Sequence, residues 1–140
     1  MDFALTDDQR AIQDAARVFA DAELAPHSAR WDEDKHFPVE VMKQAAEMGF
    51  CGIYTAEEHG GMALGRVEAA VIFEELSRGD VATAAFLSIH NMATWMIDRF
   101  GADDLRARFG GCAGRQRGRE AARHGQLPEQ PGGDEPDRQR

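Results

Sequence analysis

Paired carboxylates are the side chains of this sequence best suited to acid–base chemistry. They include the adjacent pairs Glu57-Glu58, Glu74-Glu75 and Asp103-Asp104. A general acid and a general base must converge on one proton, whereas adjacent residues of a helix point in different directions. We therefore expect all three pairs to be solvated surface groups. The spacing of serines, cysteines, histidines and acids also predicts no nucleophilic site.

Histidines and cysteines predict no metal site, because the histidines share no ligand spacing with one another or with Cys51. His90 differs from the others because it lies, with Asn91, inside a long apolar segment. Buried polar groups need partners, so these two side chains either pack with satisfied hydrogen bonds or face a ligand. Both interpretations remain open. The remaining histidines of the first 109 residues are His27, His36 and His59.

Two segments near the C-terminus resemble phosphate-binding motifs but lack the necessary context. Residues 110–114, Gly-Gly-Cys-Ala-Gly, have no strand before them and no Lys-Ser or Lys-Thr after them, as a phosphate-cradling loop requires. Arg115, Arg117 and Arg119 resemble a basic nucleic-acid segment, but five acidic residues in the same tail nearly cancel the tail's positive charge. Neither segment therefore predicts phosphate or nucleic-acid binding.

Charge and cysteine usage favour a cytoplasmic protein that does not bind nucleic acid. Residues 1–109 carry 10 Lys and Arg against 20 Asp and Glu, and so acidic a surface repels phosphate backbones. Two cysteines make no disulfide framework. No basic segment followed by an apolar one comes after Met1, so we expect no secretory signal. Val81–Ile97, the longest mainly apolar stretch, is too short and too polar to span a bilayer.

Hydrophobic periodicity predicts an all-α domain of about five helices at the N-terminus. Thr6, with Gln9 three residues later, is typical of a capping box that opens a first helix, and Pro26 ends it. The link 27–36 then crosses the surface with the Trp31 indole turned inward. The expected buried stripe of the first helix is Ile12, Ala15, Ala16, Phe19 and Ala22.

The next two predicted helices also have recognisable ends. Pro38 suits the first position of the second helix, and Gly49 is a natural residue to end it. The third helix runs from about Gly65 to Ser77. The side chains expected to be buried are Val41, Met42, Ala45 and Met48 in the second helix, and Val67, Ala70 and Val71 in the third, with Ile72, Phe73 and Leu76 around its flank.

The fourth predicted helix, Val81 to Phe100, is capped by Asp80 and closed by Gly101. Apolar residues occupy nearly its whole circumference, which is typical of a helix buried on all sides. Four short neighbours can hardly enclose it, so we expect it to meet a surface that this chain does not encode. A fifth helix begins near Asp103 and stops after Phe109.

In its order of helices and in several motifs, the chain resembles the N-terminal helical domain of the acyl-CoA dehydrogenases over residues 1–109. Within the family, the run 88–101 is most similar to the members that act on isobutyryl-CoA in valine breakdown. The matching motifs are Leu5-Thr6 with Gln9, Phe37-Pro38, Gly49-Phe50 with Gly52 and Tyr54, Gly60-Gly61, Phe73-Glu74-Glu75-Leu76-Ser77, Ser88-Ile89-His90-Asn91-Met92, Trp95-Met96-Ile97-Asp98 and Phe100-Gly101.

This resemblance implies an oxidoreductase that binds FAD and removes hydrogen from the α and β carbons of an acyl-CoA. In such enzymes a glutamate of the last domain takes the α-proton, the flavin takes the β-hydride, and an electron-transfer flavoprotein reoxidises the flavin. The family also implies a homotetramer. Matching the fourth helix to the family places Ala84, Ser88 and Met92 at positions that line the acyl pocket. Their i, i+4, i+8 spacing is compatible with one lining, although Ala84 and Met92 could equally be packing residues.

After Phe109 the resemblance stops. Residues 110–140 contain 7 Gly, 6 Arg, 4 Gln and 3 Pro, with Leu127 as the only large aliphatic residue, so we expect a disordered tail. The β-domain that should follow is missing, and a frameshift would explain the change in composition. We expect a fragment that supplies part of the acyl pocket and is inactive alone. The alternative is a non-catalytic helical module that associates with a full-length paralogue.

Overall fold

The computed structural model describes residues 4–109, and these form an all-α domain, as the sequence predicts. The tail that the sequence predicts to be disordered lies outside the described residues, and the domain boundary after Phe109 stays a prediction. In chain order the elements are α1 (Asp7–Phe19), the π-helix η1 (Ala20–Leu24), α2 (Ser28–Asp34), α3 (Val39–Glu47), the 3-10 helix η2 (Glu57–His59), α4 (Arg66–Gly79), α5 (Val81–Phe100) and α6 (Asp103–Phe109).

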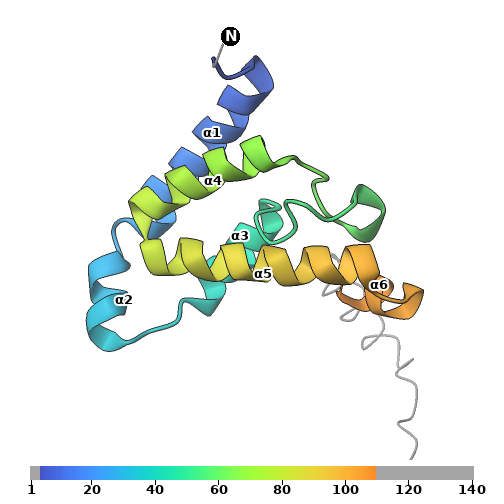
Figure 1. Cartoon of the computed structure of the whole chain (residues 1–140). Coiled ribbons are helices and arrows are strands. Elements are labelled where there is room, and N and C mark those ends of the chain that lie inside the picture. The colour runs from blue at the N-terminus through green and yellow to red at the C-terminus, as the bar shows by residue number, and fades with distance from the viewer. Residues whose placement is uncertain (1–3, 110–140) are drawn as a thin grey trace, which may run out of the picture.

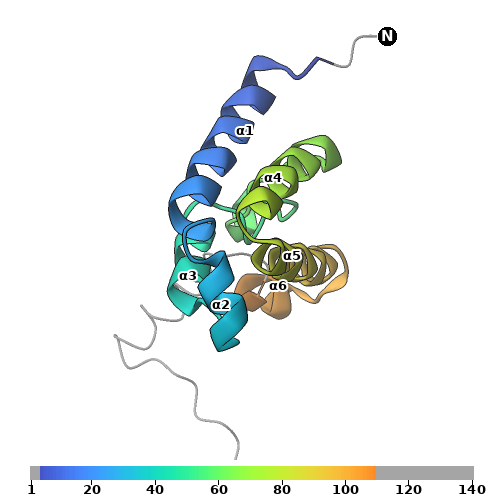
Figure 2. The same cartoon turned by 90° about the vertical axis from the view of Figure 1, so that its left-hand side faces the viewer.

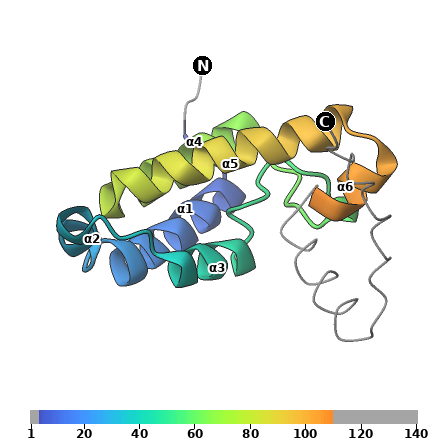
Figure 3. The same cartoon turned by 90° about the horizontal axis from the view of Figure 1, so that it is seen from below.

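The helices are arranged in two layers. Helices α1 and α3 make one layer, and α4 and α5 make the other (Figure 2). Helix α4 contacts both α1 and α5, while α2 and α6 lie near opposite ends of α5 (Figure 1, Figure 3). The core between the layers contains Phe19, Leu24, Phe50, Ile53 and Leu87, all at most 7% exposed. One side of α5 therefore faces this core and the other does not.

The beginning of α1 confirms the predicted capping box. Thr6 Oγ1 accepts a hydrogen bond from the Gln9 amide at 3.2 Å, and Gln9 Oε1 accepts one from the Thr6 amide at 3.0 Å. The predicted stripe is wrong at Ala15 and Ala22, which are exposed. The wide turn of η1 explains the exposure of Ala22, since it shifts the helical register after Phe19 and turns Ala20 and Leu24 inward. Ala15 precedes this turn, so the shift does not account for it.

The predicted surface link 27–36 is instead largely helical, because α2 occupies most of it. Lys35 ends α2 in the left-handed region, with φ 52°, and the Ser28 hydroxyl donates to Asp80 Oδ1 at 2.7 Å. Trp31 is half-buried and packs against the core, as expected. The link was hard to assign because α2 is short and its N-terminal residue, His27, makes no capping bond with its side chain.

Helices α3 and α4 begin and end within two residues of their predicted limits. Pro38 is the residue before α3 and not its first residue, and Gly49, with φ 86°, ends it. In both helices part of the predicted buried face is wrong. Met48, Val67 and Ala70 are exposed. The side chains that α4 buries are Ala69, Val71, Ile72, Glu75 and Leu76.

We expect Gly79→Ala to lower the free energy of unfolding by about 1–3 kcal/mol, the usual cost of overpacking. A Cβ atom at this position would lie 2.8 Å from Leu24 Cβ and 2.9 Å from the Ala20 carbonyl oxygen. This clash outweighs the gain in helix propensity, which is about 1 kcal/mol. Gly65→Ala is the matched control, because its Cβ would meet only the flexible Glu68 carboxylate. Urea unfolding followed by circular dichroism measures both, and equal stability of the two variants would contradict the expectation.

Candidate functional site

The predicted limits of α5, Val81 and Phe100, are confirmed, and the helix has two contrasting faces. Its first turn is capped by Asp80, whose Oδ2 accepts a hydrogen bond from the Thr83 amide at 2.7 Å. The inner face consists of the buried residues Thr83, Ala84, Leu87, Asn91 and Thr94. On the outer face the exposed large apolar residues are Val81, Phe86, Ile89, Met92, Met96 and Phe100. Phe37 packs on Phe86, but within residues 4–109 these six side chains remain 44–73% exposed, as expected for a helix that meets a further surface.

Asn91 is the polar centre of the inner face, and it is fully buried. Its Oδ1 accepts a hydrogen bond from the Ile53 amide at 2.7 Å, and its Nδ2 donates to the carbonyl oxygens of Phe50 at 2.7 Å and Leu87 at 2.9 Å. The side chain therefore holds the irregular segment 50–53 against α5. Of the two interpretations left open by the sequence, satisfied packing is the one the structure supports for Asn91.

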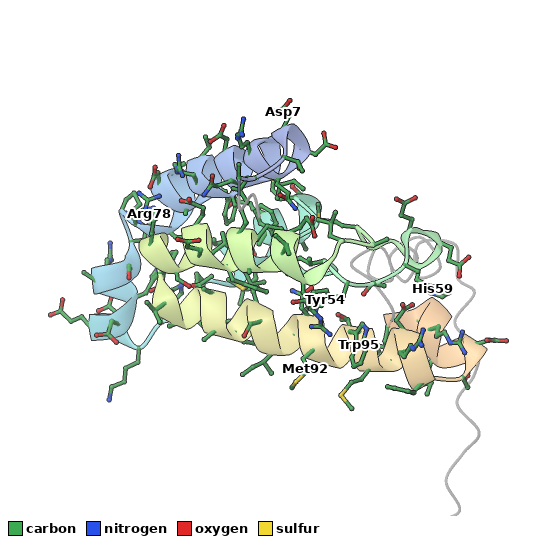
Figure 4. All side chains as sticks on the ribbon, turned by 45° about the horizontal axis from the view of Figure 1, so that its top comes forward. Asp7, Tyr54, His59, Arg78, Met92 and Trp95 are labelled. Atoms are coloured by element: carbon green, nitrogen blue, oxygen red, sulfur yellow. The ribbon has the colours of Figure 1, made fainter. Side chains whose placement is uncertain are left out.

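The three residues predicted to line an acyl pocket lie in different environments. Ala84 is 3% exposed and faces the core, whereas Met92 is 55% exposed and points away from the body of the domain (Figure 4). Ser88 is exposed, and its hydroxyl donates to the Ala85 carbonyl oxygen at 2.8 Å. Ser88 and Met92 are thus available to a ligand or a further domain. Ala84 could contribute only at the edge of such a lining.

A histidine–aspartate pair ties η2 to the C-terminal half of α5. His59 Nδ1 lies 2.6 Å from Asp98 Oδ1, and the Ala56 amide donates to Asp98 Oδ2 at 3.3 Å. No local sequence pattern indicates this pair, because 39 residues separate its members. His90 is half-buried, and its ring stacks on Phe86 with the centroids 6.4 Å apart.

Glu75 corrects the expectation that all the paired acids are solvated. Its side chain is 4% exposed, and it pairs with Arg17 at 2.7 Å and with Arg78 at 2.6 Å. Glu74 and the other two pairs are exposed. Hydrogen bonding from Arg17, with a further contribution from Arg78, lowers the pKa of Glu75 to about 2 against the opposing effect of burial. A carboxylate so firmly ionised is a structural ion-pair partner and not a proton acceptor at neutral pH.

A surface cleft of about 950 Å³ lies between α2, the segment 35–38 and the first turns of α5. Its walls include Trp31, Phe37 and Phe86, and its polar groups include Asp32, Asp80 and Lys35. FAD carries a diphosphate, and two carboxylates against one lysine give the lining no excess of positive charge to bind it. The cleft therefore does not fit the flavin cofactor that the resemblance implies.

A metal site and a membrane-spanning helix are also absent from the described part of the chain. Residues 4–109 hold no group of three or more His, Cys, Asp or Glu side chains that could bind a metal ion. None of the helices within that range is both long and apolar enough to cross a membrane.

The structure is thus an all-α domain in which the outer face of the long helix α5 is apolar and exposed. Residues 6–111 match the family described as acyl-CoA dehydrogenase, N-terminal domain. The chain belongs to the acyl-CoA dehydrogenase family.

Known proteins resemble this chain in both sequence and fold. Isobutyryl-CoA dehydrogenase, mitochondrial, of Bos taurus is 45% identical over 105 residues, which are 75% of this chain and 25% of that protein. A structure of glutaryl-coenzyme A dehydrogenase with glutaryl-CoA superposes with a TM-score of 0.75 and 26% identity, over 83% of this chain and 31% of the other. The FAD complex of PigA gives 0.73 and 28%, over 79% and 30%. The chain thus spans between a quarter and a third of the length of these proteins.

Proposed function

We propose that this chain is the N-terminal helical domain of an FAD-dependent acyl-CoA dehydrogenase that acts on a short branched acyl-CoA such as isobutyryl-CoA. The observation that carries the proposal is the outer face of α5, which is apolar and remains exposed within residues 4–109. The 45% identity to the Bos taurus protein supports the choice of substrate. The role of the domain in the reaction is to shape the binding site and not to carry out the chemistry.

In the whole enzyme, bound FAD would accept the β-hydride while a glutamate of a later domain removes the α-proton. The residues of this chain would act on the other end of the acyl group. Met92 and Ser88 on the outer face of α5 would form the distal wall of the pocket, with Ala84 at its edge. An apolar wall excludes water from the reacting carbons and limits the length of the acyl group that fits.

We further propose that the 140-residue chain is inactive alone, because none of its described clusters offers a general base beside a flavin site. Reoxidation by an electron-transfer flavoprotein and assembly into a homotetramer would be properties of the whole enzyme. Purified chain should show no flavin spectrum and no turnover of isobutyryl-CoA with an artificial electron acceptor. Yellow protein with measurable turnover would contradict this part of the proposal.

The pocket assignment is tested by a chimera in which residues 6–109 replace the matching segment of the Bos taurus enzyme. Met92→Ala should widen the distal end, so the ratio of kcat/KM for hexanoyl-CoA over isobutyryl-CoA should rise about tenfold or more. Val67→Ala on α4 is the control, since Val67 is also exposed, at 54%, but lies outside the proposed wall. An unchanged ratio in active Met92→Ala enzyme would exclude Met92 from the pocket.

A further inference from the structure

Arg66, the first residue of α4, is held by two aromatic rings from other elements. Its guanidinium carbon lies 4.3 Å from the centroid of the Tyr54 ring and 5.5 Å from that of the Trp95 ring. Tyr54 belongs to the segment between α3 and η2, whereas Trp95 belongs to α5, and the two lie near one another in Figure 4. Both rings are half-buried, so they attract the cation and restrict its orientation. We call these three residues the arginine clamp.

The hydrogen-bond donors of the clamped guanidinium have no acceptor within the described part of the chain. No hydrogen bond or ion pair joins Arg66 to another residue of 4–109, and its side chain is exposed. A guanidinium has five N–H donors, and aromatic rings offer them no oxygen atom. The rings therefore fix the position of the cation and leave its donors available at the surface.

The acidic side chains closest to the clamp along the chain already have other partners. Glu68, two residues after Arg66, accepts a hydrogen bond from Gln9 Nε2 at 2.8 Å. Asp98, three residues after the clamp tryptophan, has its Oδ1 2.6 Å from His59 Nδ1. Residues 1–109 contain 20 Asp and Glu against 10 Lys and Arg, yet none of the described acids pairs with the clamp. The carboxylate that it lacks must come from elsewhere.

The clamp lies at the border of the outer face of α5. The Trp95 ring packs edge-on against that of Phe100, with the centroids 5.9 Å apart, and Phe100 is a member of the outer face. In the proposed enzyme this face meets the remainder of the protein. Tyr, Trp and Arg are also the residue types that most often contribute the binding energy of protein interfaces. The position and the composition of the clamp both fit the edge of such an interface.

We propose that Arg66 is an interdomain anchor, which binds the carboxylate of an Asp or Glu side chain from the part of the enzyme outside this chain. The two oxygens of a carboxylate match two parallel N–H donors of a guanidinium. A free phosphate fits less well, because a single arginine on a domain of net negative charge attracts it weakly. A side chain brought by a docked domain is instead present at high effective concentration. The inference rests on the proposed function, since it requires this chain to be one domain of a longer enzyme.

Zero-length cross-linking of the chimera with the Bos taurus enzyme identifies the partner of Arg66. In this chimera Arg66→Lys keeps the positive charge and places an amine beside the rings, and a carbodiimide joins an amine to a carboxylate in direct contact with it. We expect mass spectrometry to find position 66 joined to an acidic residue outside the transplanted segment 6–109. The Lys43–Glu40 pair, 2.5 Å apart, is the internal control for the reaction. A position 66 that reacts only within 6–109, or not at all while the control pair reacts, would overturn the proposal.

A double-mutant cycle in the chimera tests whether the contact stabilises the enzyme. Arg66→Gln and the amide replacement of the identified acid are made singly and together, and the melting temperature of each variant is measured. Each single change should lower it by about 2 °C, and the double variant should melt no lower than the less stable single one. Val67→Gln, at a neighbouring exposed position, should instead be additive with the loss of the acid. Additive losses at Arg66 would show that it does not anchor the acid.

The two proposals fail in different measurements. A missing cross-link in a chimera that still turns over isobutyryl-CoA refutes the anchor and leaves the enzyme assignment intact. A folded chimera without turnover refutes the assignment, while the cross-link at position 66 can still be read.

Discussion

Replacing Asn91 by alanine is expected to lower the free energy of unfolding of this domain by about 3–4 kcal/mol. The substitution leaves the Ile53 amide and the Phe50 carbonyl oxygen buried without the partner that now lies 2.7 Å from each. Each unsatisfied buried group costs about 1–3 kcal/mol. The loss should appear as a lower midpoint in urea unfolding, together with faster amide exchange of Ile53.

A matched control for this result lies one turn away on the same helix. Ser88→Ala also removes a polar side chain from α5, but the Ser88 hydroxyl is exposed and bonds only to the Ala85 carbonyl within its own helix. We expect a change below about 0.5 kcal/mol for this surface site. If Asn91→Ala is no more destabilising than Ser88→Ala, then Asn91 does not hold the segment 50–53 in place.

The second large effect concerns Glu75, where Glu75→Gln should cost about 2–3 kcal/mol at neutral pH. Removing one member of a buried ion pair commonly costs about 3–5 kcal/mol. The lower figure applies here because the side chains of Arg17 and Arg78 are 44% and 52% exposed, so that water screens part of the interaction. Thermal unfolding of parent and variant measures the difference.

The same carboxylate makes the stability of the domain dependent on acid. Its pKa is lowered from 4.5 to about 2, so the folded state favours the ionised form. The stabilisation is complete above pH 4.5, and it is lost progressively as the pH falls towards 2. The stability difference between parent and Glu75→Gln should therefore shrink over that interval. Glu74→Gln alters an exposed neighbour, and its difference should stay small throughout; a parallel fall in both would contradict this account.

Helix limits were the most predictable part of this fold, because their signals are local. The capping box at Thr6 and the cap at Asp80 each depend on atoms within three residues of one another, and glycines mark other helix ends. The register after Phe19 could not be predicted in this way. A single wide turn breaks the fixed angular step that pattern analysis assumes.

The candidate site was only partly predictable, because burial depends on which elements meet. The apolar circumference of α5 predicted its unmatched outer face. It could not show that Ala84 faces inward while Met92 faces outward, since that division follows from contacts with α4 and the segment 50–53. The prediction that Glu75 is solvated is wrong for the same reason. Nothing near it in sequence indicates that Arg17, 58 residues earlier, pairs with it.

Cys51 belongs to the segment that Asn91 holds against α5, and its side chain is almost completely enclosed, at 9% exposed. Its sulfur lies 4.0 Å from the Met42 carbonyl oxygen, under the packed side chains of the core. An alkylating or oxidising reagent in the surrounding water can reach this thiol only after the segment has separated from the helix. The rate of modification at Cys51 is therefore set by how often the inner layer opens.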